Sequence, residues 1–396
     1  MSAFRIGRLP PAGEYIGPGV LRRVLSDPDP QKTLTEGLQA ILGRDKGITF
    51  HASGREAMRV ALAHLAKERG RDEVVVPAYT CFSVAASAVA AGLRVRLVDV
   101  DLDGRIDLDS LARLPLERAA AVVVCNLFGN PEPIEAVRKL AHAAGAAVVD
   151  DAAQSLGGTT PEGPAGARGD VGILSFARGK PLSALGGGAI VWHSAPPPLD
   201  ARHTPRRAAA LVRALAYDAA LAAPVFQLLA AVPALEIGRT VYDPGFAHGA
   251  MTGASLSLAA AQLPDVVVAG TRRAERAHAL AARVVAVSEF SPILASEGTT
   301  GVYARLALVA PSGPVRDRAL ARLWALGAGT SGMYPSALDR VNGLKERLVD
   351  PTDVSGAQEL AARLLTLPTH GRLRTGMLAE VLEALQDTAG RRHGSS

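Results

Sequence analysis

The sequence predicts an α/β protein with a large, mostly parallel sheet and a smaller C-terminal α/β domain. Apolar runs rich in Val, Ile and Leu alternate with helical patterns between about residues 46 and 195. Such continuous apolar runs are typical of parallel strands that helices cover on both faces. Hydrophobic residues make up 48% of the 396 residues, which is enough for one large core and a second, smaller one.

The elements of the large domain follow in order. Residues 1–45 are interpreted as an irregular lead-in with one helix. A helix is predicted to start after Ser53 and Gly54, because a serine N-cap precedes the apolar pattern of AMRVALAHL. Five strands are predicted, at 74–76 and within the segments RVRLVDVD, AAAVVVCNLFG, AAVVDDAAQSLGG and DVGILSFARGKPL. Helices are predicted after the turn at Pro77 and in PIEAVRKLAHAAG.

Residues 195–245 interrupt this alternation. A proline- and arginine-rich stretch is followed by the apolar segment AALAAPVFQLLAAVPALEIG. Pro224, Gln227 and Pro233 interrupt that segment, so it falls short of a membrane span. We expect a helical hairpin that packs on the body of the protein or on a second subunit. The alternative is a peripheral membrane contact through about 200–240, with a basic arm beside an apolar helix.

Strand and helix patterns return after residue 250. The segment MTGASLSLAAAQLPDVVVAGTRRAERAHALAARVVA is typical of long helices that join two domains. From about residue 300, GVYARLALVAP, VRDRALARLWALG and QELAARLLTLPTHGRL alternate strand and helix again. The predicted division is therefore a lead-in (1–45), a large domain (46–250) and connecting helices with a small domain (251–396).

Composition narrows the classes of function. The net charge is +5, but the basic residues are scattered and aromatics make up only 4%, so no nucleic-acid surface is predicted. A modestly basic surface suits an anionic small molecule instead. Cys81 and Cys125 lie in apolar surroundings and lack the spacing of a metal site, so no metal is expected. The N-terminus carries no apolar signal segment, which predicts a cytoplasmic protein.

Polar side chains follow several of the predicted strands, at the edge where open α/β sheets bind ligands. They are Thr80, Asn126, Asp151, Gln154, Ser175 and Lys180. Lys180 is one of only six lysines in an arginine-rich chain, and it stands between an apolar strand and the glycines 186–188. A surface cation there could equally be arginine. A primary amine indicates chemistry that arginine cannot perform, namely imine formation and proton transfer near neutral pH.

Pyridoxal 5'-phosphate (PLP) would use a lysine of this kind. The cofactor needs an amine for its aldehyde, an acid for its ring nitrogen and N–H groups for its phosphate. Residues 53–55 open a helix whose N-terminus favours an anion. Asp150 and Asp151 end a strand, and because successive strand residues point to opposite faces, only one should meet the ring. Ser175 ends the following strand and can add a hydroxyl to the phosphate site.

A family resemblance supports this interpretation. The chain resembles the DegT/DnrJ/StrS family in the segments ASGREAM, VVVPAYTCFSVAASAVAAGLRVRLVDVD, VVDDAAQSLGG, GDVGILSFARGKPLSALGGGAIV and LLTLPTHGRL. The resemblance implies fold type I, with a mostly parallel seven-stranded sheet and PLP as cofactor. It also implies transfer of an amino group from an amino acid, by family likeness glutamate, to a keto group on a nucleotide-linked sugar. A homodimer is implied because fold-type-I sites usually lie between subunits.

Two roles in catalysis follow from the resemblance. Lys180 matches the lysine that forms a Schiff base with PLP and then moves a proton between the donor and the cofactor. Asp151, rather than Asp150, matches the acid that pairs with the pyridine nitrogen. Gln154 matches the glutamine near the ring hydroxyl of the cofactor.

The remaining cofactor contacts are also assigned by resemblance. Gly54, Arg55 and Ser175 match the phosphate-binding positions, with arginine where the family usually has threonine. The aromatic residue that stacks on the ring aligns with Cys81 or Phe82, and Phe82 is favoured on chemical grounds.

Two departures place the chain in an outlying branch of the family. The asparagine-aromatic-arginine triplet that contacts the partner subunit's cofactor is replaced by AHGAMTG, where His248 could substitute. The usual GEGG after the lysine is LGGG. One alternative is therefore a regulatory or scaffold protein without turnover. Another is a different PLP reaction on the same fold, although sugar dehydratases of the family carry histidine where this chain has Lys180.

Overall fold

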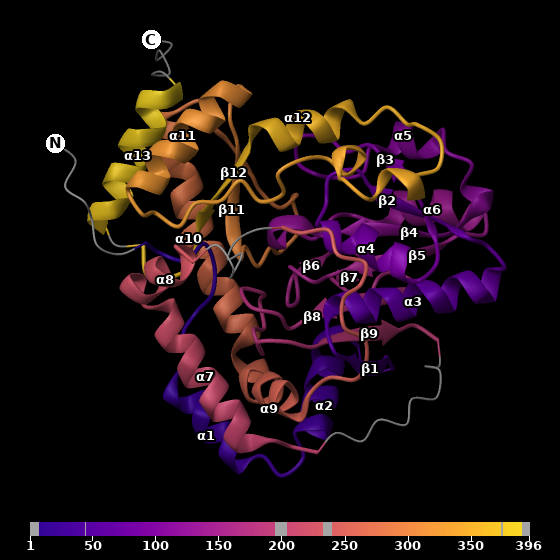
Figure 1. Cartoon of the computed structure of the whole chain (residues 1–396), viewed down its shortest axis with the longest axis horizontal. Coiled ribbons are helices and arrows are strands. Elements are labelled where there is room, and N and C mark those ends of the chain that lie inside the picture. The colour runs from indigo at the N-terminus through magenta and orange to yellow at the C-terminus, as the bar shows by residue number, and fades with distance from the viewer. Residues whose placement is uncertain (1–7, 44, 195–203, 233–239, 374, 390–396) are drawn as a thin grey trace.

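A seven-stranded sheet forms the centre of the protein (Figure 1). We describe the protein from a computed structural model, which covers residues 8–43, 45–194, 204–232, 240–373 and 375–389. The strand order is β1-β9-β8-β5-β4-β2-β3. The bounds are β1 (Gly47–His51), β2 (Glu73–Pro77), β3 (Arg94–Val98), β4 (Ala119–Cys125), β5 (Ala147–Asp151), β8 (Val171–Ser175) and β9 (Gly188–Trp192). Only β9 runs antiparallel to its neighbours. The predicted fold class is confirmed, and β1 and β9 are strands that the sequence analysis did not predict.

The valine-rich strands are buried on both faces of the sheet. Val74 and Val76 of β2 pack into one cluster with α3 (Gly54–Arg69) and α4 (Phe82–Ala90). Val75, between them, packs into a second cluster with α6 (Glu135–Ala143) and α5 (Leu108–Ala112). This alternation follows from the two-residue period of a strand, and it explains why the strands are apolar throughout.

Helix α3 has clear local start and stop signals. The Ser53 hydroxyl accepts a hydrogen bond from the Glu56 amide at 3.1 Å and caps the N-terminus. Gly70 ends the helix in the left-handed conformation, with φ 62°. Apolar side chains of α3 face the sheet, and they include Ala57, Met58, Ala61, Leu62 and Leu65. The sequence signals therefore fix the position of the α3 N-terminus at the edge of the sheet.

The N-terminal region contains two helices where one was predicted. They are α1 (Pro18–Ser26) and α2 (Pro30–Leu42), and each begins with a proline, which suits the first turn of a helix. The Asp29 side chain caps α2 by accepting from the Lys32 amide at 3.1 Å. Both helices pack against α9 (Gly253–Gln262). Pro18 and Pro30 thus mark the starts of these two helices.

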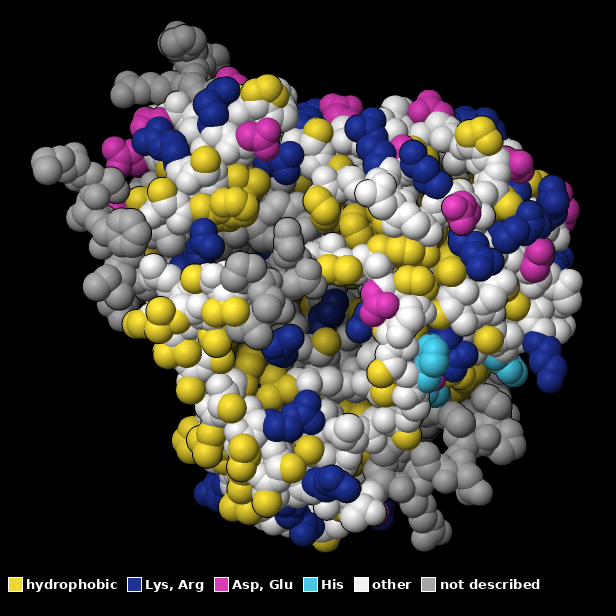
Figure 2. All heavy atoms as spheres, in the orientation of Figure 1, with side chains coloured by type: hydrophobic (Ala, Val, Ile, Leu, Met, Phe, Trp, Pro, Cys, Tyr) yellow, Lys and Arg dark blue, Asp and Glu magenta, His cyan; other side chains and the backbone are white. Residues whose placement is uncertain are grey.

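The described part of the 195–245 insertion forms α7 (Arg207–Leu221) and α8 (Ala223–Ala230), bent by 88° at the break between them. One side of α7 packs against α1 and α9. The opposite side exposes Val212 and Leu215, and α8 exposes Leu228, within the hydrophobic strip that Figure 2 shows along this edge of the molecule. The α7–α8 pair and the mostly buried α9–α10 stretch are apolar and long enough for a membrane span on composition alone.

The small domain is an antiparallel three-stranded sheet covered by helices. Its strands are β10 (Ser291–Ile293), β11 (Arg305–Val309) and β12 (Leu364–Pro368). The large domain has a separate two-stranded hairpin, formed by β6 (Thr159–Thr160) and β7 (Gly163–Pro164). The helices are α10 (Val266–Val287), α11 (Gly313–Ala325), α12 (Ser355–Arg363) and α13 (Thr375–Ala389). Helix α10 leads from the large sheet to this sheet (Figure 1).

Candidate active site

The N-terminus of α3 and the end of β8 meet closely at the carboxyl edge of the sheet. A Cβ atom added to Gly54 would lie 2.8 Å from Ser175 Cβ and 3.0 Å from its Oγ. A Cβ on Gly188, at the start of β9, would lie 2.5 Å from the Gly54 nitrogen. Only glycine fits at both positions. The start of α3 and the Ser175 side chain therefore lie together at this edge, where a helix N-terminus favours an anion, and we call this place the Gly54–Ser175 cradle.

The two aspartates that end β5 have different environments. Asp150 is fully buried and makes an ion pair with Arg168, with Nη2 to Oδ1 at 2.9 Å. It also accepts from Asn126 Nδ2 at 2.7 Å and the Gly166 amide at 2.8 Å. Asp151 accepts from the Ala153 amide at 2.9 Å and from the Cys125 thiol at 3.9 Å. Asp150 is thus held in a structural network, and Asp151 faces the other side of the sheet.

The Asp151 carboxylate has no ion pair with any residue that the structure describes. Burial raises its pKa, and the charge of nearby Lys180 opposes this rise. Burial also raises the pKa of the neighbouring Cys125 thiol, which stays protonated and neutral. The carboxylate therefore has no ion-pair partner, and a cation placed against it would stabilise its charged form.

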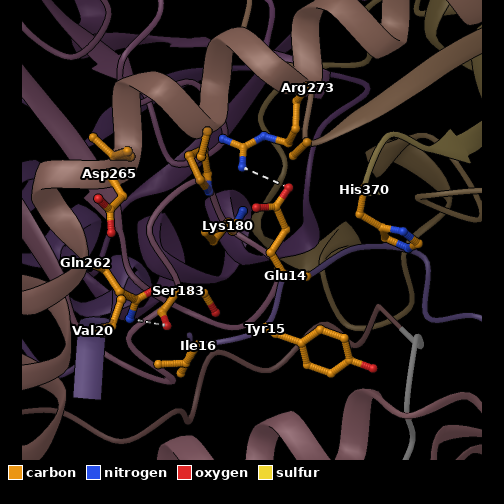
Figure 3. A pocket seen from close by; sticks show the side chains of 16 residues that line it. Glu14, Tyr15, Ile16, Val20, Lys180, Ser183, Gln262, Asp265, Arg273 and His370 are labelled. Carbon is orange, nitrogen blue, oxygen red and sulfur yellow. Dashed lines mark hydrogen bonds and ion pairs between the residues drawn. The ribbon is translucent and has the colours of Figure 1, made fainter. Parts of the chain in front are cut away.

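Lys180 lies in the loop between β8 and β9. Its amide donates to the Ala177 carbonyl at 3.3 Å, and Gly179 before it has φ 74°. The loop is closed by the Phe176 amide, which donates to the Gly187 carbonyl at 2.9 Å. Lys180 also lines a cavity of about 110 Å³, together with residues of the N-terminal segment and α10 (Figure 3). The lysine is therefore near Asp151 and also open to a cavity.

Gln154 is held by a residue that the sequence analysis missed. Its Nε2 donates to the Tyr334 hydroxyl at 3.0 Å, and the Tyr334 ring lies 5.4 Å from that of Tyr79. Burial raises the pKa of both tyrosine hydroxyls, so both stay neutral, and the Tyr334 hydroxyl is the acceptor of the Gln154 hydrogen bond. Tyr334 belongs to the small-domain part of the chain. No local pattern in the turn-rich segment GTSGMYPSAL indicates that it reaches Gln154.

The Arg55 side chain is occupied away from the cradle. It forms an ion pair with Asp243 at 3.6 Å, and its guanidinium lies 4.9 Å from the centre of the Phe246 ring. His248 bonds Glu56 of the same chain, with Nδ1 to Oε2 at 2.8 Å. Arg55 can thus offer its amide to an anion at the helix N-terminus, while His248 is tied to the first turn of α3.

The two candidates for ring stacking differ in burial. Phe82 begins α4 and is buried in the large-domain core. Cys81 is half-buried, accepts from the Ser83 hydroxyl at 3.0 Å, and is near enough to Cys125 and Tyr334 to influence the pKa of both. The choice between them stays a prediction. Within the described ranges, no group of three or more His, Cys, Asp or Glu side chains is placed to hold a metal ion.

Glu132 lies beside the hydrogen-bond network of Asp150, and it leads to a prediction of how the free energy of unfolding depends on pH. Its Oε1 accepts from the Ile106 amide at 2.9 Å, and burial raises its pKa from 4.5 to about 8. Below pH 4.5 the folded and unfolded states both carry the proton. As pH rises from 4.5 to 8, the unfolded state ionises first, so the free energy of unfolding should fall by up to about 4–5 kcal/mol.

Glu132→Gln should remove this part of the pH dependence, because it keeps the acceptor for Ile106 and cannot ionise. We expect the variant to match wild type near pH 4.5 and to be more stable at pH 8. Urea unfolding across this range measures the difference. Parallel curves for the two proteins would show that Glu132 ionises normally in the folded state.

The chain matches the sequence model of one known protein family over most of its length. A model of the DegT/DnrJ/EryC1/StrS aminotransferase family matches residues 25–386. A UDP-N-acetyl-3-dehydro-α-D-glucosamine 3-aminotransferase of Acidithiobacillus ferrooxidans is 33% identical over 143 residues, or 35% of this chain and 38% of that protein. A dTDP-3-amino-3,4,6-trideoxy-α-D-glucose transaminase of Streptomyces venezuelae is 34% identical over 145 residues, which are 35% of this chain and 37% of that protein. The aligned part thus spans a little over a third of these curated relatives.

Solved structures resemble the chain over nearly its whole length. PseC of Helicobacter pylori, an aminotransferase involved in pseudoaminic acid biosynthesis, has a TM-score of 0.74 at 16% identity, covering 96% of this chain and 99% of PseC. The GDP-4-keto-6-deoxy-D-mannose-3-dehydratase of Escherichia coli, solved with bound hydrated PLP, has a TM-score of 0.74 at 17% identity, covering 96% and 100%. At such identities the likeness concerns the fold, and it confirms the predicted fold-type-I architecture.

Proposed function

Because the chain belongs to the DegT/DnrJ/EryC1/StrS aminotransferase family, we propose that it is a PLP-dependent aminotransferase. It would move an amino group from an amino acid, glutamate first among candidates, to a keto group on a nucleotide-linked sugar. The sugar class is supported by relatives whose names specify UDP- and dTDP-linked sugars. Family membership confirms the resemblance seen in the sequence, and the activity of this chain is what the experiment below tests.

One observation carries the proposal. The Asp151 carboxylate lacks an ion pair with any described residue, Lys180 lies near it, and the Gly54–Ser175 cradle lies at the same sheet edge. These groups fit PLP in charge and position. The cradle would hold the phosphate, Asp151 would face the ring nitrogen, and Lys180 would hold the aldehyde carbon covalently. Gln154, fixed by Tyr334, would face the ring hydroxyl.

Each residue has a distinct task in the reaction. Bound PLP supplies an electron sink for the carbon from which the amino donor loses a proton. Asp151, at the end of β5, would favour a positive charge on the ring nitrogen and so strengthen that sink. The Lys180 amine would take up the proton from the donor carbon and return it on the cofactor side. The Tyr334 hydroxyl keeps Gln154 in place through a neutral hydrogen bond.

The proposal has three further parts. We expect a homodimer, a cytoplasmic location and Phe82 as the stacking residue. Sedimentation of the purified protein measures the first. The α7–α8 pair has an exposed apolar side on Val212, Leu215 and Leu228, which a second subunit could cover. Vesicle flotation with and without residues 200–240 tests the alternative that this side contacts a membrane.

The proposed activity is tested by reconstituting the purified chain with PLP. We expect an absorption band near the visible edge, fixed by borohydride, and peptide mass spectrometry that finds the cofactor on Lys180. L-Glutamate should then change the spectrum and release 2-oxoglutarate. Asp151→Asn should still bind PLP but convert it at least about 10²-fold more slowly. No band with excess PLP would overturn the proposal and favour a scaffold protein without turnover.

A further inference from the structure

Two adjoining cavities connect Lys180 with the surface. The inner cavity, of about 110 Å³, is lined by Lys180 and Arg273, and Figure 3 shows Glu14 pointing between them. The outer cavity, of about 600 Å³, lies between α1, α10 and the loop after β12. Glu14, Tyr15 and His370 line both cavities. A ligand in the outer cavity would therefore lie next to the cavity that Lys180 lines.

Four arginines line the two cavities, and they outnumber the acidic side chains beside them. Arg272, Arg273 and Arg276 come from α10, and Arg372 comes from the loop after β12. Glu14 Oε1 lies 3.8 Å from a guanidinium nitrogen of both Arg273 and Arg276, which is beyond hydrogen-bond distance. The other carboxylate of the lining, on Asp265, is paired with Arg23 of α1. We call Arg272, Arg273, Arg276 and Arg372 the arginine mouth.

Several donors of the arginine mouth are buried and lack partners in the described structure. Arg273 is 6% exposed, and its Nε donates to the Val302 carbonyl at 3.1 Å, but its Nη2 has no partner. Arg372 donates to the Gly13 carbonyl and stacks on Tyr15 at 5.0 Å, while its Nε and Nη1 have no partner. Buried donors without partners are costly, so this arrangement favours an anion with several acceptor oxygens.

We propose that the arginine mouth binds the diphosphate of a nucleotide-linked substrate, whose sugar then extends through the inner cavity to Lys180. This inference rests on the proposed function and adds a binding subsite to it. Guanidinium groups match phosphate oxygens in bidentate pairs, and a diphosphate offers enough oxygens for arginines on opposite walls. The outer cavity, of about 600 Å³, has the size of a small-molecule site, and the inner cavity, which Lys180 lines, is smaller.

The test is calorimetric titration of the full-length, PLP-loaded protein with UDP, dTDP and GDP. We expect binding of the diphosphates, weaker binding of UMP and none of uridine. Arg276→Gln and Arg372→Gln should each weaken UDP binding by about 10-fold or more. Glu14→Gln, which removes the competing carboxylate, should tighten it about threefold. Arg322→Gln is the matched control, because Arg322 pairs with Asp387 on the small-domain surface at 2.9 Å.

The outcomes separate this inference from the proposed function. Absence of binding by all three diphosphates, or equal UDP binding by wild type, Arg276→Gln and Arg372→Gln, would overturn the subsite. If the two variants respond more weakly to L-glutamate but bind UDP as wild type does, the arginine mouth binds the amino donor. That result would also overturn the diphosphate subsite. Arg276 is 44% exposed in its side chain, so its substitution should leave the fold intact. A chain that binds UDP but takes up no PLP would keep the subsite and refute the aminotransferase.

Discussion

In the Lys180→Arg variant, we expect the rate at which L-glutamate converts bound PLP to fall by at least about 10³-fold. Arginine keeps the positive charge beside Asp151 and the length of the side chain. It cannot hold the aldehyde carbon or take up a proton near neutral pH, because its pKa is too high. The measurement is the rate of spectral change after mixing with L-glutamate, together with the amount of 2-oxoglutarate released.

Two other lysines make the Lys180 prediction selective. Lys139→Arg is the matched control, because Lys139 is exposed and pairs with Glu135 on α6 at 3.7 Å. Its rate should equal that of wild type. Lys46 is the one buried lysine among the described residues, with Nζ 2.9 Å from His193 Nδ1. Cofactor found on Lys46 after borohydride, or a Lys180→Arg rate above a tenth of wild type, would contradict the role of Lys180.

Much of the fold could be predicted because burial leaves a periodic trace in the sequence. The run VVV of β2 indicates a strand covered on both faces, and Val74, Val75 and Val76 do pack into alternating clusters. Strands β1 and β9 were missed for a local reason. GITFH is short and mixed, and the three glycines at 186–188 suggest a loop, whereas the last of them, Gly188, begins β9 and is needed for close contact with Gly54.

The candidate site was predictable only where its residues follow strand ends. Asp151, Ser175 and Lys180 could be named in advance because the carboxyl ends of parallel strands share one edge. Tyr334 and Arg273 could not be named. They reach the site from a turn and from the helix between domains, and their positions depend on how the small domain packs against the sheet. Such contacts between distant segments leave no periodic pattern in the sequence.

Arg168→Met is expected to lower the free energy of unfolding by about 3–5 kcal/mol, because it leaves the Asp150 charge buried without its partner. Arg168 donates to both Asp150 oxygens at 2.9 and 3.0 Å, to Asn126 Oδ1 at 2.8 Å and to the Glu132 carbonyl at 2.7 Å. Urea unfolding gives the stability. Arg138→Met is the control, since Arg138 pairs with Glu135 at the surface and should change stability by less than about 1 kcal/mol.

The double variant Asp150→Asn, Arg168→Met separates the cost of an unpaired charge from loss of packing. It removes both charges, so it should recover much of the lost stability. A loss equal to that of Arg168→Met alone would place the effect in packing, and a single-variant loss below 1 kcal/mol would contradict the buried ion pair. The pair also fixes the end of β5, where Asp151 points the opposite way. We therefore expect Arg168→Met to weaken PLP binding as well, although Arg168 lies on the other face of the sheet.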